Sequence, residues 1–257
     1  MYERLIWLAA VAVVLCLGTA HAQSPHDIIA SADRVRNAGE PFRVTSVLTE
    51  YVSGKPGNQT TLTVYSKEDK TTGQFRNLVR YVDPPRDAGK MALLDGQNLW
   101  FYDPAAKSSV RISPQQRLVG QASIGDVLTV NFAVDYKGTV LGDESIADAE
   151  HQTRACWHLD MTAATPTAVY SRAEYWVEHG SYWPIKAKFY SDSGRVLKVL
   201  YYRGFTQRLG ATRPSGAVII DAVDATLVTT VQFNNPAFQD IPDFWFQRDY
   251  LPRLRPE

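Results

Sequence analysis

The sequence predicts a mainly β protein built on one strongly curved antiparallel sheet, an incomplete β-barrel with a helical lid. After Glu40-Pro41, apolar residues such as Phe42, Val44 and Leu48 alternate with polar ones, which is the period of a β-strand. The connections between successive runs are short and favour antiparallel pairing, because a parallel pair needs a crossover of about a dozen residues. About ten such strands in one sheet curl instead of staying flat.

One helix is expected before the strands, over residues 24–37. Ser24 suits the N-cap, Pro25 the first helical position and Asp27 the first turn, while Asn37 and Gly39 favour its end. Its apolar residues recur at spacings of three and four: Ile28, Ile29, Ala32 and Val35. This spacing gives one narrow apolar stripe that can lie against a sheet.

The later strands are predicted from runs of apolar and aromatic residues. These runs lie near 62–64, 75–81, 93–94, 99–102, 157–161, 169–177, 185–190, 196–202, 218–223 and 227–233. A hairpin loop is expected from Asp95 to Asn98, where Gly96 can adopt the positive φ of a short turn. A second helical stretch is expected at 124–132, covering the concave face together with the first helix. Residues 207–214, which contain Gly210 and Pro214, are expected to form at most a long loop.

The N-terminus has the pattern of a secretory signal peptide over residues 1–22. An uncharged apolar run from Leu5 to Leu17 leads into Ala20-His21-Ala22, a small-residue cleavage site. About 13 apolar residues are too few to span a bilayer, which takes roughly 20. We expect cleavage after Ala22, export, and a single domain over residues 23–257. Cys156 is then the one cysteine of the mature chain, so an intramolecular disulfide is excluded.

The charges of the chain exclude one class of partner. The chain has 27 lysine and arginine residues in total and 27 aspartate and glutamate residues in total. A nucleic-acid-binding protein needs a basic surface, and the balanced charge predicts no nucleic-acid partner.

Motifs of the common catalytic and metal sites are absent from the sequence. It has no H-E-x-x-H, no cysteine and histidine pairs at zinc spacing, and no G-x-S-x-G, since 120–125 has the wrong spacing. We therefore predict that the protein is not an enzyme and holds neither a metal nor a cofactor.

One row of reactive side chains has two interpretations. Cys156, His158 and Asp160 alternate along one predicted strand and so share a face. Such neighbours are roughly 6.5 Å apart, which is too far for direct hydrogen bonds without favourable rotamers. They are either the start of a thiol-based hydrolase site or the less buried side of a strand whose other face carries Trp157 and Leu159. The second interpretation is favoured.

Five runs of sequence together resemble one known family. In order they are PRDAG at 85–89, NLWFYDP at 98–104, VRIS at 110–113, EYWVE at 174–178 and PIKAKFY at 184–190. Following a signal peptide and a helix, this series is similar to the LolA-like outer-membrane lipoprotein-sorting proteins of Gram-negative bacteria. The resemblance covers roughly residues 84–205.

The resemblance implies an incomplete antiparallel barrel with a helical lid over an apolar cavity. The best-known members shield the acyl chains of lipoproteins in the periplasm, and relatives of this subtype work beside inner-membrane RND-type transporters. An acyl chain exposed to water costs on the order of 10 kcal/mol, at about 0.8 kcal/mol per methylene. A carrier of lipoprotein acyl chains or of a membrane lipid is therefore expected in the periplasm. The residues expected to line the cavity or lid are Ile28, Ile29, Val35, Leu93, Trp100 and Phe101.

Several alternatives stay open at this point. Residues 117–132 are less aromatic and less acidic than the usual family pattern, which leaves the cargo undecided. The chain could instead be a non-enzymatic accessory module that docks on an envelope transporter. Its aromatic tail, residues 242–252, could close the edge of the sheet or offer a docking surface. The oligomeric state is not predicted.

Overall fold

The computed structural model describes residues 23–254, and the predicted signal peptide lies outside them. The first strands of the chain are β1 (Phe42–Val52), β2 (Lys55–Glu68), β3 (Phe75–Asp83), β4 (Met91–Asp95), β5 (Asn98–Asp103) and β6 (Ser108–Arg111). A separate small pair consists of β7 (Arg117–Val119) and β8 (Ala122–Ser123). The remaining strands are β9 (Tyr136–Ala147), β10 (Thr153–Ala163), β11 (Arg172–Glu178), β12 (Pro184–Tyr190), β13 (Val196–Arg208), β14 (Ala211–Asp221) and β15 (Leu227–Phe238).

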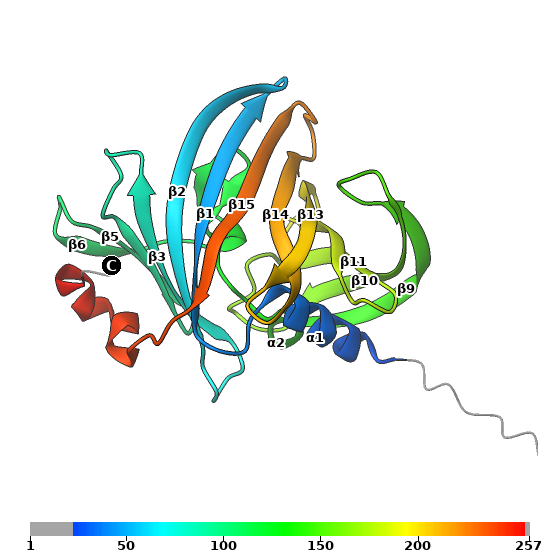
Figure 1. The fold of residues 1–257 in the computed structure, drawn as a ribbon, viewed down its shortest axis with the longest axis horizontal. Helices are drawn as coiled ribbons and strands as arrows, with labels where there is room; N and C mark the ends of the chain where they lie inside the picture. The colour runs from blue at the N-terminus through cyan, green and yellow to red at the C-terminus, as the bar shows by residue number, and fades with distance from the viewer. Residues whose placement is uncertain (1–22, 255–257) are drawn as a thin grey trace, which may run out of the picture.

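Thirteen of these strands form one antiparallel sheet that curves around a concave side (Figure 1). Its order is β6-β5-β4-β3-β2-β1-β15-β14-β13-β12-β11-β10-β9. Two meanders, a first one of β1–β6 and a second one of β9–β14, thus meet at the last strand, β15, which lies between β1 and β14. The sheet keeps two edges, β6 and β9, so it is not closed. The predicted fold class is confirmed.

Helix α1 (Pro25–Arg36) lies on the concave side and confirms the first predicted helix. The Ser24 side chain accepts a hydrogen bond of 3.1 Å from the Asp27 amide and so caps the helix. Ile28 and Ile29 are fully buried in the main core, as the apolar stripe requires. None of the helices formed by residues 23–254 is long and apolar enough to cross a membrane.

The rest of the concave side is covered by residues 112–135, here called the inner segment. It contains β7 and β8, the 3₁₀ helix η1 (Ile124–Asp126) and the short helix α2 (Phe132–Asp135). The helix expected over 124–132 is therefore wrong in extent. Only η1 lies within that range, and α2 begins at its last residue. The segment contributes these buried residues to the main core: Val119, Ala122, Ile124, Val127, Leu128, Val130 and Phe132.

Two tight hairpins test the turn predictions. Gly96 has a φ of +56° between β4 and β5, as the predicted hairpin requires. The loop expected at 207–214 is wrong, because β13 continues to Arg208 and β14 begins at Ala211. Leu209 and Gly210 form the turn with φ of +49° and +74°. Both central residues have the positive φ that a two-residue hairpin favours.

The C-terminal tail packs on the outer face of the first meander (Figure 1). Its 3₁₀ helices are η2 (Asp243–Phe246) and η3 (Arg248–Arg253). Together with the sheet, it forms a second buried cluster of Tyr65, Leu78, Met91, Leu93, Tyr102, Ile241, Phe246, Leu251 and Leu254. The tail contacts β3, β4 and β5, so it covers a face of the sheet instead of extending its edge.

Candidate ligand cavity

A cavity of about 120 Å³ lies between the concave face of the sheet, the end of α1 and the inner segment. Most of its lining is apolar: Phe42, Val44, Val127, Leu128, Leu200, Tyr202, Ala217, Ile219, Val231 and Phe233. Strand pairing explains this lining. Tyr202 lies opposite Ala217, and Ala217 lies opposite Val231, so the three share one face across β13, β14 and β15.

A buried ion pair holds the inner segment to β13. The Asp126 and Lys198 side chains are 2% and 7% exposed and form a salt bridge. Asp126 also accepts hydrogen bonds from the Ser123 amide at 2.8 Å and the Tyr170 hydroxyl at 2.9 Å. Burial and the Asp126 carboxylate raise the pKa of Tyr170, so its phenol stays protonated and can donate.

Side-chain amides of the first meander hold the inner segment on its other side. The Asn77 side chain accepts from the Thr129 amide at 2.9 Å and donates to the Thr129 carbonyl at 2.8 Å. Gln74 repeats this pattern with Asn131, at 2.7 and 3.1 Å. The Ser66 and Thr129 hydroxyl oxygens are 2.7 Å apart. These side chains take the place of a strand partner for the backbone of the inner segment.

The end of α1 provides a third set of polar contacts to the inner segment. Arg36 and Asn37 each donate to the Val130 carbonyl at 2.9 Å. The Asp33 carboxylate accepts from the Ala133 amide at 2.8 Å and forms an ion pair with Arg36. The cover of the cavity is therefore fixed by directional contacts as well as by apolar packing.

Two more arginines line the cavity near the same end of α1. Arg213, which is 8% exposed, donates to the carbonyls of Arg34, Val35 and Asn37 at 2.8, 3.1 and 2.6 Å. Arg208 donates to the Phe233 carbonyl at 2.6 Å. Neither arginine stands out in the sequence, because Gly210 and Pro214 predict a loop where the hairpin lies.

The predicted site residues on α1 lie on the concave side. Ile28 and Ile29 are fully buried in the main core, and Val35 is partly buried at the end of the helix. None of the three lines the cavity. Their role in ligand binding stays a prediction.

The predicted site residues on β4 and β5 lie on opposite faces of the sheet. Phe101 packs against the main core on the concave side. Leu93 and Trp100 are cross-strand partners and pack under the C-terminal tail on the outer face. The structure therefore does not bring the six predicted residues together. Their role in ligand binding stays a prediction.

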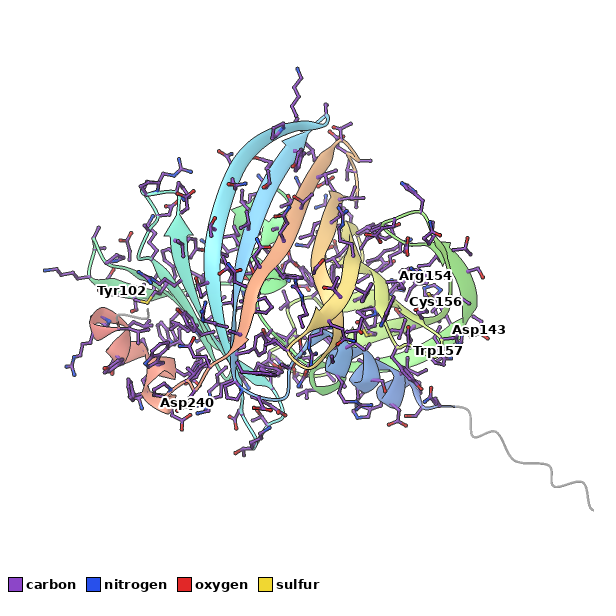
Figure 2. All side chains as sticks on the ribbon, in the orientation of Figure 1. Tyr102, Asp143, Arg154, Cys156, Trp157 and Asp240 are labelled. Atoms are coloured by element: carbon purple, nitrogen blue, oxygen red, sulfur yellow. The ribbon has the colours of Figure 1, made fainter. Side chains whose placement is uncertain are left out.

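The Cys156, His158 and Asp160 side chains share the outer face of β10, but each has different partners. Cys156 is fully buried beside Trp176. His158 lies between two glutamates at 3.3 and 3.2 Å, and Asp160 pairs with an arginine at 2.6 Å. Figure 2 shows Cys156 and Trp157 towards the opposite end of the sheet from Tyr102. Among residues 23–254, no group of three or more His, Cys, Asp or Glu side chains is placed to hold a metal ion.

Native Cys156 is expected to resist alkylation. Burial and, to a lesser extent, Glu178 raise the pKa of its thiol to about 12 against the opposing effect of Arg154, so little thiolate forms at neutral pH. We expect iodoacetamide to label the folded protein far more slowly than the protein in guanidinium chloride, as measured by intact mass. Equal labelling rates in the two states would contradict a buried thiol.

Comparison with known proteins places this architecture among existing families. A family model whose description reads "-like: Uncharacterized protein" matches residues 73–253. No curated protein matches the sequence. A LolA superfamily protein from Nitrosomonas europaea is similar with 29% identity and a TM-score of 0.79, covering 89% of this chain and 100% of that one.

Two further solved structures share the fold at lower identity. One is an outer membrane lipoprotein-sorting protein domain from Vibrio parahaemolyticus, with 18% identity, a TM-score of 0.73 and coverage of 89% and 98%. The other is a DUF1329 family protein from Desulfovibrio piger, with 19% identity, a TM-score of 0.74 and coverage of 89% and 100%.

Proposed function

The chain belongs to the LolA-like family, and on that premise we propose that it is a carrier that shields acyl chains of a lipoprotein or a lipid inside its curved sheet. The observation that carries this proposal is the apolar cavity on the concave face, bounded by the end of α1 and the inner segment. A protein that hides an acyl chain from water needs such a surface, since each methylene costs about 0.8 kcal/mol in water.

The size of the cavity supports a cover that moves. At about 120 Å³ it is smaller than ordinary ligand pockets, which hold roughly 300–1,000 Å³. Cargo therefore enters only if the inner segment or α1 shifts, and the polar contacts that hold them re-form when it leaves. A closed state of this kind protects the apolar lining while the carrier is empty.

The setting of the carrier is part of the proposal. We place it in the periplasm, exported by the signal peptide of residues 1–22, with residues 23–257 acting as one non-enzymatic domain. An RND-type transporter is the proposed membrane partner, since the LolA-like subtype that the sequence resembles works beside such transporters.

Mass spectrometry tests the carrier function directly. The mature protein is purified gently from the periplasm and measured under native conditions and after organic extraction. We expect a lipid or an acylated peptide at about one per chain. A protein that arrives empty and takes up no added lipid would contradict the proposal.

A larger side chain at the cavity wall is expected to block uptake. Ala217→Phe places a ring in the cavity, because Ala217 lines it and is 2% exposed. We expect at least a tenfold loss of lipid affinity, about 1.4 kcal/mol, and a stability loss of about 1–3 kcal/mol from overpacking. Fluorescent lipid titration and thermal melts measure the two effects. Val218→Phe, on the opposite face of the same strand, is the control. An equal loss of affinity in that variant would show that the cavity is not the lipid-binding site.

A second candidate function rests on the edge strand β9. This strand is 12 residues long, mostly exposed, and pairs on one side only with the described residues. Such an edge can accept a strand from a partner. If the protein co-purifies with an envelope transporter and carries no lipid, the accessory role is favoured over the carrier.

A further inference from the structure

Three arginines line the cavity, and only one of them forms an ion pair with a carboxylate among the described residues. Arg36, Arg208 and Arg213 all line it. Arg36 is paired with Asp33. The carboxylate in the lining, Asp126, is paired with Lys198. Within the described part of the chain, neither Arg208 nor Arg213 forms an ion pair with a carboxylate.

Arg213 is a buried cation whose charge is only partly offset. Its Nη1 donates to carbonyls at the end of α1, where the helix dipole is negative, and its Nη2 donates to the Leu209 carbonyl at 3.4 Å. Its Nε is buried and has no acceptor in the structure. Burial lowers the pKa of Arg213, whereas the pKa of Arg36 is raised in spite of its burial, and Asp33 is its charged partner. A buried charge without a counter-ion is costly.

Arg208 repeats this arrangement on the other strand of the hairpin. One of its terminal nitrogens donates to the Phe233 carbonyl at 2.6 Å, and its Nε is also buried without an acceptor. The turn at Leu209 and Gly210 brings the two arginines to the same end of the cavity. Capping of α1 accounts for the contacts of Arg213, but it does not account for Arg208.

We propose that the cavity takes an amphiphile with an anionic headgroup, a carboxylate or a phosphate, held by Arg208 and Arg213 while its acyl chain lies against the apolar lining. Guanidinium groups bind both anions through paired N–H donors. This inference rests on the carrier function and specifies its cargo. It favours a fatty acid or an anionic lipid over a lipoprotein, whose acyl chains are attached through uncharged ester and amide groups.

Competition against a neutral dye tests the headgroup. Nile red bound to the mature protein is displaced by dodecanoate, dodecyl phosphate or dodecanol, which share one chain length. We expect the two anions to displace the dye at concentrations at least about tenfold lower than dodecanol. Arg208→Gln should reduce this preference to nearly one. Arg203→Gln, an exposed arginine on the same strand, should keep it.

Each outcome bears on a different statement. Equal displacement by all three compounds, or an anion preference that survives Arg208→Gln, overturns the headgroup proposal and leaves the carrier function intact. If no compound displaces the dye, the carrier function fails and the headgroup proposal fails with it. Calorimetry with inorganic phosphate completes the test. If phosphate binds as tightly as dodecyl phosphate, the site takes the free ion, and the proposal of an amphiphilic ligand is overturned.

Discussion

A disulfide between Ser66→Cys and Thr129→Cys is expected to reduce lipid uptake more than tenfold, and a reductant should restore it. The two hydroxyl oxygens are 2.7 Å apart, and replacing both by sulfur puts the atoms within reach of an S–S bond of about 2.05 Å. Ser66 belongs to β2 and Thr129 to the inner segment. The bond would therefore hold the inner segment over a cavity too small for an acyl chain.

The effect of the disulfide on lipid uptake is measured by titrating a fluorescent fatty acid into the oxidised and the reduced protein. The variant is made in a Cys156→Ala background, so that the two introduced thiols are the only ones in the mature chain. Ser66→Cys alone in that background is the control and should respond to neither oxidant nor reductant. Uptake by the fully oxidised double variant at the level of the reduced one would show that cargo enters without movement of the inner segment.

Asp126→Asn is expected to lower the free energy of unfolding by about 3–5 kcal/mol, because it leaves the Lys198 charge buried without its partner. The two side chains are 2% and 7% exposed, so water cannot replace the lost carboxylate. The amide keeps the size of the original side chain, which separates the charge effect from packing. Urea unfolding followed by fluorescence measures the difference.

A surface pair provides the matched control for this loss. Asp249 pairs with Arg248 at 2.8 Å but is 84% exposed, so Asp249→Asn should cost less than about 1 kcal/mol. The double variant Asp126→Leu with Lys198→Met should recover much of the stability, since an apolar pair has no charge to desolvate. Equal losses for Asp126→Asn and Asp249→Asn would show that burial of the pair contributes nothing.

The regular part of the fold could be predicted from local sequence. A period of two identifies strands because successive side chains point to opposite faces, and Ser24 with Pro25 identifies the start of a helix. The same period cannot say which face becomes concave. Leu93 and Phe101 both look like cavity residues, yet the C-terminal tail covers one of them and the main core the other.

The inner segment could not be predicted in this way, because its conformation depends on distant partners. Thr129 and Asn131 are held by side chains of β3 and its preceding turn, and Asp126 by Lys198 on β13. No local period marks such contacts. Glycine and proline near Arg208 indicated a loop, although the same residues also fit a tight hairpin, and the two cavity arginines were missed for that reason.

The position of β15 between β1 and β14 determines the order in which the sheet can assemble. The meanders β1–β6 and β9–β14 pair neighbours in sequence, and such local contacts form early. The pairing of β1 with β15 joins strands from nearly opposite ends of the chain, and it closes a long loop at an entropic cost. We therefore expect the pairing of β1 with β15 to form last. Until Leu227–Phe238 is in place, the chain holds two half-sheets with unpaired edges at β1 and β14.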